Sequence, residues 1–357
     1  MRTRCQMAGE LAFPVIIFLI SAGSVVFFGI RLAIYGDALA SLTGWGRLFV
    51  GSVLVALATS LPELSTNISA VRLDPPNPAL AVGNVMGANM LTMFNISLVA
   101  LMFGGKKFLD KVAPEQGILA ALAILLTGMA VLFGAFKMDI AFWQIGLSSL
   151  LLIVVFLAGM RVVYVTKPAG QDFGGDEPEA GDMTLKRAWV LFLGVSLGVV
   201  IAGFFLAWST DRIADITGVA SSTLGIIAVS LVTTMPEMSS AIAAARMGAA
   251  DLGVAGLFGS NAFNVTILFF ADPFYRGGIL GNQTEPAHFI AGGMAVVLMA
   301  VVLVVILARN RLKAPLVAAV LALVILAYIA GAVAVASVGG AGNDPVTIAA
   351  NARAFSP

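Results

Sequence analysis

Two stretches of the chain, residues 51–72 and 225–246, read GSVLVALATSLPELSTNISAVR and GIIAVSLVTTMPEMSSAIAAAR. Aligning Glu63 with Glu237 also matches polar and proline positions on both sides, which pair Thr59 with Thr233, Ser60 with Thr234, Pro62 with Pro236, Ser65 with Ser239 and Arg72 with Arg246. Chance similarity between apolar helices explains matched Leu and Ala, but it does not explain matched Thr, Pro and Glu. The chain therefore contains an internal repeat.

The similarity continues into the next segment of each copy. Residues 81–101 read AVGNVMGANMLTMFNISLVAL, and residues 253–270 read GVAGLFGSNAFNVTILFF. After a two-residue difference in the connecting turn, the matched pairs are Gly87 with Gly259, Asn89 with Asn261 and Thr92 with Asn264. Each repeat thus spans two apolar segments that carry polar residues at fixed places.

Composition places the 357-residue chain among membrane proteins. It is 60% hydrophobic and 11% charged, whereas soluble domains carry about 25% charged residues. A net charge of +1 excludes nucleic acid as a partner, because no basic face neutralises phosphates. The chain has one cysteine, Cys5, and one histidine, His288, so an intramolecular disulfide is excluded and a zinc site is not expected.

The sequence predicts an all-α membrane protein, because an apolar helix of roughly 20 residues crosses the hydrocarbon core and a β-barrel would show short alternating segments. Ten candidate spans follow from the charged and Gly/Pro-rich breaks: Leu11–Ile34, Leu42–Ile68, Pro78–Phe103, Gly117–Phe136, Ile140–Val163, Ala188–Trp208, Ile216–Ala245, Leu252–Ala271, His288–Leu307 and Ala314–Ala336. The first span is interpreted as structure; the alternative is a cleaved leader.

The polar stretch within residues 166–186 divides the chain into five-span halves, residues 1–165 and 187–336, followed by a tail at 337–357. We interpret the stretch as a flexible linker; weak regulatory binding of cations is the alternative. Because five is odd, the second half starts on the opposite membrane face, so the two repeats are inverted. Thirteen of the 20 Lys and Arg residues fall in one set of alternate loops. That set is predicted to be cytoplasmic, with both termini outside.

Only Glu63 and Glu237, among the carboxylates, fall deep inside apolar segments. An ionised carboxylate there costs about 2.5 to 3.5 kcal/mol even on the mildest insertion scale. Two such groups facing each other repel unless protons or cations neutralise them. The pair therefore indicates a cation site at the interface of the repeats.

The prolines beside the two acids support the same interpretation. Pro62 and Pro236 lack an N–H, so carbonyls one turn earlier lose their intrahelical partners; these are the carbonyls of Ala58, Thr59, Val232 and Thr233. Freed carbonyls at membrane depth are tolerated where they line a cavity, and Ca²⁺ takes six to eight oxygen ligands. Taken singly, each feature also has a structural explanation: a proline kink, a hydroxyl bonded to its own backbone, or a glycine that permits close packing.

The repeated motifs resemble the paired α-repeats of the sodium/calcium exchanger family, within the cation/calcium antiporter superfamily. The resemblance rests on ATSLPE and VTTMPE and on GNVMGAN and GSNAFN, over about residues 50–102 and 223–272. The central loop is too short for the large regulatory domain of animal exchangers, so the chain is similar to prokaryotic members.

The resemblance implies that Glu63 and Glu237 are shared calcium and sodium ligands, helped by main-chain oxygens of Thr59 and Thr233. It assigns the hydroxyls of Ser60, Thr234 and Ser260 to flanking sodium sites, and it places Thr92 and Asn264 at the central polar positions. It also implies that the first and sixth spans slide across a rigid core. Two residues depart from the family pattern: Ala88 stands where Ser is usual, and Thr92 where Asn is usual.

The function predicted from the sequence is secondary antiport of Ca²⁺ against Na⁺ by alternating access, without a cofactor, in the inner (plasma) membrane of a bacterium or archaeon. The alternatives are an H⁺/Ca²⁺ exchanger that uses the same acids and a passive cation channel. An intramembrane hydrolase is a remote alternative, because the G-x-S-x-G match at Gly194–Gly198 lies inside an apolar span rather than on a strand-to-helix turn. Oligomeric state, K⁺ dependence and selectivity among divalent cations stay open.

Overall fold

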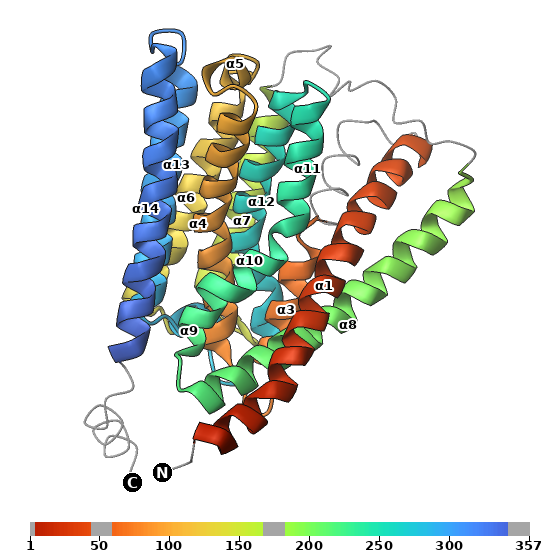
Figure 1. The fold of residues 1–357 in the computed structure, drawn as a ribbon, viewed down its shortest axis with the longest axis vertical. Coiled ribbons are helices and arrows are strands. Elements are labelled where there is room, and N and C mark those ends of the chain that lie inside the picture. The colour runs from red at the N-terminus through yellow and green to blue at the C-terminus, as the bar shows by residue number, and fades with distance from the viewer. Residues whose placement is uncertain (1–3, 44–58, 167–182, 342–357) are drawn as a thin grey trace.

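The structure, a computed structural model, describes residues 4–43, 59–166 and 183–341. In these ranges it is helical except for one two-stranded hairpin (Figure 1). The helices are α1 (Arg4–Thr43), α3 (Leu61–Val71), α4 (Pro78–Met102), α5 (Lys106–Leu109), α6 (Gln116–Phe136), α7 (Leu147–Val165), α8 (Leu185–Thr217), α9 (Ser221–Leu224), α10 (Ser230–Thr233), α11 (Met235–Arg246), α12 (Ala250–Ala271), α13 (Pro286–Ala308) and α14 (Ala314–Ala341). A π-helical turn, η2 (Gly225–Val229), joins α9 to α10, and two 3₁₀ turns, η3 (Asp272–Phe274) and η4 (Leu280–Asn282), follow α12.

Eight helices in the described ranges are long and apolar enough to cross a membrane, and the bent pair 221–246 makes a ninth candidate. Large apolar side chains, such as Phe13, Leu157 and Val333, are exposed along several of them, as expected for surfaces that face lipid. The predicted span Leu42–Ile68 falls mostly outside the described residues, which resume at Thr59. The chain is therefore a helical, multi-pass membrane protein.

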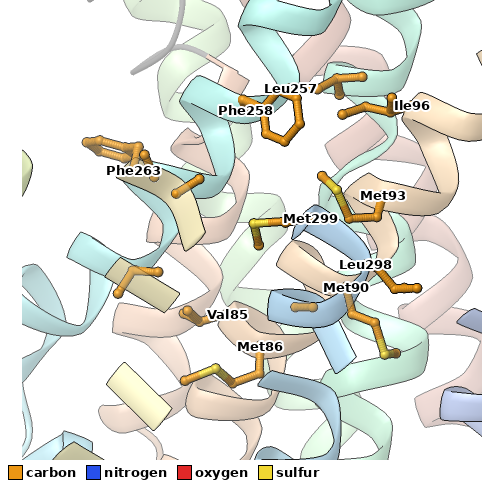
Figure 2. Packing of buried hydrophobic residues seen from close by; sticks show 14 of the residues in the cluster. Val85, Met86, Met90, Met93, Ile96, Leu257, Phe258, Phe263, Leu298 and Met299 are labelled. Atoms are coloured by element: carbon orange, nitrogen blue, oxygen red, sulfur yellow. The ribbon is translucent and has the colours of Figure 1, made fainter. Parts of the chain in front are cut away.

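Helices α4 and α12 form the centre of the bundle. Their most apolar windows are 78% and 72% buried, against 17% for α1. Figure 2 shows the packing between them and α13, where Met86, Met90 and Met93 of α4 lie among side chains of α12 and α13 such as Phe258 and Met299. Because the two central helices carry the second segment of each repeat, the repeats meet in the core.

Glycines allow α4 to approach the π-helical turn backbone to backbone. A Cβ built on Gly83 would lie 2.7 Å from the Ser222 carbonyl oxygen, and one on Gly87 would overlap the backbone of Ile226. Gly225 meets α4 in the same way from the other side. Gly87 therefore serves close packing, as small residues do between membrane helices, and it fixes η2 against the first repeat.

Helices α1 and α8 pack along each other as an oblique pair, drawn red and green at the right of Figure 1. Leu32, Val195 and Val199 form an apolar cluster between them that is separate from the main core. The pair contacts the bundle mainly through α3, α10 and α11. Helices α3 and α11 carry the repeated Pro-Glu motifs, and α10 directly precedes the second motif.

Several predicted boundaries differ from the observed helices. Helix α1 runs from Arg4 to Thr43, beyond both ends of the predicted span Leu11–Ile34, and the bent pair begins at Ser221 rather than Ile216. The fifth span begins at Leu147 rather than Ile140, because β1 (Ala141–Phe142) and β2 (Ile145–Gly146) form an antiparallel hairpin there. Helix α8 continues to Thr217, past the predicted end at Trp208, and stops at Gly218, whose φ of 73° ends the helix. Helix α8 also begins at Leu185, inside the predicted linker, and α14 reaches Ala341, inside the predicted tail.

Candidate cation site

The second Pro-Glu motif lies at a break between helices. Helix α10 ends at Thr233, α11 begins at Met235, and the two segments are bent by 41°. Pro236 occupies the first turn of α11, where its missing N–H is tolerated but leaves the carbonyl of Val232 without that donor. The break predicted from the proline is therefore observed in the second repeat.

The first motif has a matching helix start. Helix α3 begins at Leu61, Pro62 lies in its first turn, and Ser60 precedes it. Glu63 occupies the first turn of α3, as Glu237 does in α11. Each carboxylate thus lies at a helix N-terminus, where the helix dipole favours negative charge.

Both carboxylates are enclosed by protein. Glu63 is 0% exposed and Glu237 is 4% exposed. Ser60, three residues before Glu63, reaches Glu237 with its hydroxyl at 3.3 Å, so the two Pro-Glu motifs lie next to each other. No Lys or Arg in the described residues forms an ion pair with either of them. The structure therefore buries both acids where the two motifs meet, and in the described part of the chain no ion pair balances their charge.

Hydroxyl groups from both repeats meet at Glu237. Ser60 donates to Glu237 Oε1 at 3.3 Å, and Ser260 donates to the same oxygen. The two hydroxyl oxygens lie 3.5 Å apart. Ser60 precedes α3 and Ser260 lies on α12, so this cluster joins the first repeat to the second at the level of the acids.

Glu63 has no comparable partner. Neither of its carboxylate oxygens accepts a hydrogen bond within the described residues, and Glu237 Oε2 also lacks one. Asn264 is 0% exposed, and both polar atoms of its side chain are without a partner. Unsatisfied buried polar groups are rare in folded proteins and each calls for an explanation. A bound cation and its water ligands would satisfy the oxygens.

The remaining predicted ligands are buried, but two hydroxyls bond to their own helices. Thr234 donates to the Ser230 carbonyl at 2.9 Å, and Thr92 donates to the Ala88 carbonyl at 2.8 Å. Thr233 donates to Asn84 at 3.2 Å, and Thr59 is 7% exposed. In the described part of the chain, the hydroxyls of Ser60 and Ser260 donate hydrogen bonds to a carboxylate oxygen, and those of Thr234 and Thr92 donate to the backbone.

Two groups of buried asparagines were not assigned a role from the sequence. Asn84 donates to Asn67 at 3.0 Å and accepts from Thr233, so it braces α3 against the broken end of α10. Asn89 and Asn261, the matched pair of the repeats, each donate to the backbone carbonyl of the other, at 3.1 and 3.5 Å. An asparagine inside an apolar span is itself a signal, because it needs a partner on another helix.

The donor set of the site consists of oxygen atoms. Within the ranges that the structure covers, no group of three or more His, Cys, Asp or Glu side chains is placed to hold a metal ion. The groups that can bind a cation are therefore the two carboxylates, the hydroxyls, the side-chain amide of Asn264 and main-chain carbonyls. Hard cations such as Ca²⁺ and Na⁺ prefer such ligands, whereas zinc and copper prefer nitrogen and sulfur.

Two other residues singled out in the sequence have structural roles. His288 is 1% exposed. Its Nδ1 accepts a hydrogen bond from the Glu285 amide, and its Nε2 lies 3.0 Å from the Ala79 carbonyl oxygen. It therefore connects the start of α13 to α4. Ser196 of the G-x-S-x-G match lies inside α8 and donates to the Phe192 carbonyl, as a helix-bonded serine does.

Comparison of the sequence with known proteins gives two findings. The sequence profile described as sodium/calcium exchanger protein matches residues 13–165 and 187–335. Inner membrane protein YrbG of Escherichia coli (strain K12) is 25% identical over 246 residues, which cover 68% of this chain and 74% of YrbG.

Two solved structures share the fold. The crystal structure of the H⁺/Ca²⁺ exchanger CAX aligns with a TM-score of 0.64 at 14% identity, covering 90% of this chain and 88% of CAX. The sodium/calcium exchanger from Methanococcus jannaschii aligns with a TM-score of 0.52 at 19% identity, covering 89% of this chain and 98% of that one. At these identities the likeness concerns the fold alone.

Proposed function

Because the chain belongs to the sodium/calcium exchanger protein family, a family of transporters and not of enzymes, we propose that it exchanges Ca²⁺ for Na⁺ across the membrane. The two ions compete for one site between Glu63 and Glu237, and the site opens to one side of the membrane at a time. No cofactor takes part. Inorganic cations and the lipid bilayer are its partners.

The observation that supports this most is the enclosed pair of acids. Glu63 and Glu237 come from the two repeats, are buried, and lack a Lys or Arg partner in the described residues. One Ca²⁺ balances their two charges, whereas three Na⁺ exceed them by one, which would make the exchange electrogenic. An empty, doubly ionised site would carry bare charges through a dehydrated barrier, which is costly. Movement therefore requires a bound load, and transport is exchange rather than leak.

The other ligands follow from their positions. We assign main-chain oxygens of Thr59 and Thr233 to the calcium site, and the hydroxyls of Ser60 and Ser260 to sites shared with Na⁺. Asn264 faces the ion with its unpartnered amide. Thr234 and Thr92 join the site only when their hydroxyls leave the helix carbonyls to which they now donate.

The proposed architecture has ten spans in two inverted repeats, residues 1–165 and 187–336, joined by the linker 166–186. Eight helices, the bent pair and the predicted span Leu42–Ile68 make up that number. The start of α1 and the end of α14 lie at the same end of the bundle (Figure 1), in agreement with an even number of crossings. Because YrbG is named an inner membrane protein, we place this chain in an inner membrane, with both termini outside as the Lys and Arg distribution predicts.

Ion flux through the purified protein tests the proposal. The protein is reconstituted into liposomes, and uptake of ⁴⁵Ca is measured with an outward Na⁺ gradient at equal pH on both sides. Uptake that needs the Na⁺ gradient, saturates with Ca²⁺ and is electrogenic supports Na⁺/Ca²⁺ exchange. Uptake that persists without any counter-ion gradient and does not saturate would indicate a channel.

A proton-coupled exchanger is the second candidate, and two residues favour it. Ala88 has no hydroxyl to offer Na⁺, and the Thr92 hydroxyl is occupied by the Ala88 carbonyl. Both changes remove sodium ligands while leaving the carboxylates, which can carry protons instead. In the same liposomes, uptake driven by a pH gradient in sodium-free buffer identifies this activity.

A further inference from the structure

The β1–β2 hairpin carries two aromatic side chains that are largely exposed. It connects α6 to α7, which are both candidate membrane spans. Trp143 is 92% exposed and Phe142 is 75% exposed, and their rings are stacked, with centroids 6.3 Å apart and 4° between the ring planes. Ile140, directly before the first strand, is exposed as well. The hairpin therefore presents an apolar tip that the described part of the protein leaves uncovered.

The turn of this hairpin holds Trp143 in a conformation that a tryptophan seldom adopts. Phe142 pairs with Ile145, so Trp143 and Gln144 form a two-residue turn. The φ of Trp143 is 58°, in the left-handed region that Gly, Asn and Asp accept more readily than bulky residues. Neither the turn geometry nor packing within the chain favours tryptophan here, so its side chain is suited to an environment outside the chain.

Two clefts flank the turn. One has a volume of about 560 Å³ and lies between the turn and Pro273. The other has a volume of about 380 Å³, and its lining includes Tyr275 and Arg276 from the loop that follows α12. Trp143 and Gln144 line both clefts. Both volumes lie in the range of about 300 to 1,000 Å³ that is typical of sites for small ligands.

Arg276 gives the second cleft a positive charge. Its side chain is exposed, and no ion pair involves it in the described residues. The neighbouring acid Asp272 is 0% exposed and accepts from the backbone amides of Gly146 and Leu280, both at 2.7 Å, so it holds the loop together. An arginine without a carboxylate partner can bind a phosphate group through two parallel hydrogen bonds.

The contacts around the hairpin place it at the level where the candidate spans end. Asn282 donates to Asp139 at 2.7 Å, and the Arg72 guanidinium lies over the Phe274 ring, 5.8 Å from its centroid. These contacts join the connections that lead into α4, α7 and α13, three candidate spans. Tryptophan and tyrosine are enriched where the hydrocarbon core of a bilayer meets the headgroups. The clefts therefore open in the headgroup region.

We propose that the clefts beside the β1–β2 turn bind an anionic phospholipid. The Arg276 guanidinium binds the phosphate group, Gln144 donates to headgroup oxygens, and Trp143 and Phe142 lie against the upper part of the acyl chains. An anionic lipid fits better than a zwitterionic one, because the charged side chain in the lining is a cation. A phospholipid also fits better than free phosphate, which would leave the apolar tip exposed.

This lipid site is distinct from the cation site. Neither Glu63 nor Glu237 lines the two clefts. The proposal therefore goes beyond ion exchange, and its test does not require transport.

Lipid titration of the intact, purified protein in detergent tests the site, because a ligand that binds the folded state raises the unfolding temperature. We expect phosphatidylglycerol to raise this temperature with saturation, phosphatidylcholine to raise it much less, and inorganic phosphate to leave it unchanged. Arg276→Gln should weaken phosphatidylglycerol binding at least about tenfold, because it removes a charge-assisted hydrogen bond. Arg246→Gln is the control, since Arg246 is also exposed, and it should keep the wild-type affinity.

Trp143→Gly separates lipid binding from a structural role. Glycine suits the left-handed turn position better than tryptophan, so without lipid this variant should unfold at no lower temperature than wild type. We expect its affinity for phosphatidylglycerol to fall at least about fivefold, because the apolar contact is lost. An unchanged affinity in Trp143→Gly would overturn the proposal. Equal affinities of Arg276→Gln and Arg246→Gln would do the same, as would equal responses of wild type to the two lipids.

Fluorescence quenching in liposomes gives an independent measurement. Replacing Trp45, Trp189 and Trp208 with Phe leaves Trp143 as the only tryptophan of the chain. Phosphatidylglycerol with brominated acyl chains should quench its emission more strongly than phosphatidylcholine brominated at the same carbons. Strong quenching by acrylamide in the water phase, with none by either lipid, would place the hairpin in water and contradict the proposal. Equal quenching by the two lipids would show an aromatic anchor without a site for an anionic headgroup.

Discussion

Glu63 and Glu237 occupy equivalent positions in the two repeats, but their surroundings differ. Glu237 accepts hydrogen bonds from Ser60 and Ser260, whereas neither oxygen of Glu63 has a partner within the described residues. The backbone around them is similar, since each acid lies in the first turn of a helix behind a proline. The difference therefore arises from side chains.

The different surroundings of the two acids follow from two positions at which the repeats carry different residues. The position that corresponds to Ser260 in the first repeat is Ala88, which has no hydroxyl to donate to Glu63. The position that corresponds to Ser60 is Thr234, whose hydroxyl donates to the Ser230 carbonyl. The site thus has one acid held by the protein and one acid left for the ion. Although the repeated motif is symmetric, the hydrogen bonds to the two carboxylates are not.

Neutralising either acid gives the largest expected effect. Glu63→Gln and Glu237→Gln each remove a charge that the cation needs, and removing one partner of a buried charge pair costs about 3 to 5 kcal/mol, on the order of a hundredfold or more in affinity. Both variants should lose ⁴⁵Ca uptake. In ion-free buffer, Glu63→Gln should raise the unfolding temperature more than Glu237→Gln, because only Glu63 is buried without donors.

Transport at the wild-type rate by either glutamine variant would remove that acid from the site. Equal changes in unfolding temperature would instead show that the two acids have equivalent surroundings, against the comparison made above. Glu10→Gln, outside the two motifs, is the control.

Removing the hydroxyl at Glu237 should have the next largest effect. Ser260→Ala deletes a hydrogen bond to a carboxylate, and such bonds contribute about 1.5 to 3 kcal/mol. We expect the Ca²⁺ concentration for half-maximal uptake to rise about tenfold or more. Ser209→Ala is the control, because Ser209 is buried but donates to the Leu206 carbonyl of its own helix. An unchanged Ca²⁺ dependence in Ser260→Ala would mean that the hydroxyl does not support Glu237.

Much of the fold could be predicted from the sequence, because the loops interrupt apolar runs with charged and Gly/Pro residues. The boundaries of α4, α6 and α12 agree with the predicted spans within two residues, and the break at Pro236 was predicted from the missing N–H. The hairpin at residues 141–146 was not, because Phe142 and Trp143 are apolar and yet 75% and 92% exposed. Hydropathy alone does not separate such residues from a span.

Other features that the sequence did not predict depend on contacts between residues far apart in the chain. Helix α8 continues past its polar positions because Asp211 accepts from Asn77 at 2.6 Å, a partner that lies 134 residues away. The roles of Asn67 and Asn84 likewise depend on helices brought together by the fold. From the sequence alone, the hydroxyls of Thr92 and Thr234 could bind an ion or donate to their own helix. The three-dimensional structure is needed to distinguish these two arrangements.

Adding the missing hydroxyl should have a smaller effect of opposite sign. Ala88→Ser places a donor at the position equivalent to Ser260, where it can reach Glu63. A hydrogen bond of about 1 kcal/mol corresponds to roughly a fivefold change in affinity. We expect the Na⁺ concentration for half-maximal exchange to fall by about that factor. Ala81→Ser, also buried on α4, is the control, and an equal change there would assign the effect to the helix rather than to the site.

The smallest effect is expected at Thr92. Its hydroxyl donates to the Ala88 carbonyl at 2.8 Å, so in the described arrangement it supplies nothing to the ion. Thr92→Val keeps the shape of the side chain and removes that hydrogen bond. Uptake of ⁴⁵Ca should stay within about twofold of wild type, because the bond lost is to the helix's own backbone. The partner position, Asn264, has no such bond, so Asn264→Leu should impair uptake more. If Thr92→Val impairs uptake as strongly as Asn264→Leu, the Thr92 hydroxyl turns towards the ion during the cycle, and the asymmetry of the two repeats belongs to one state of the protein only.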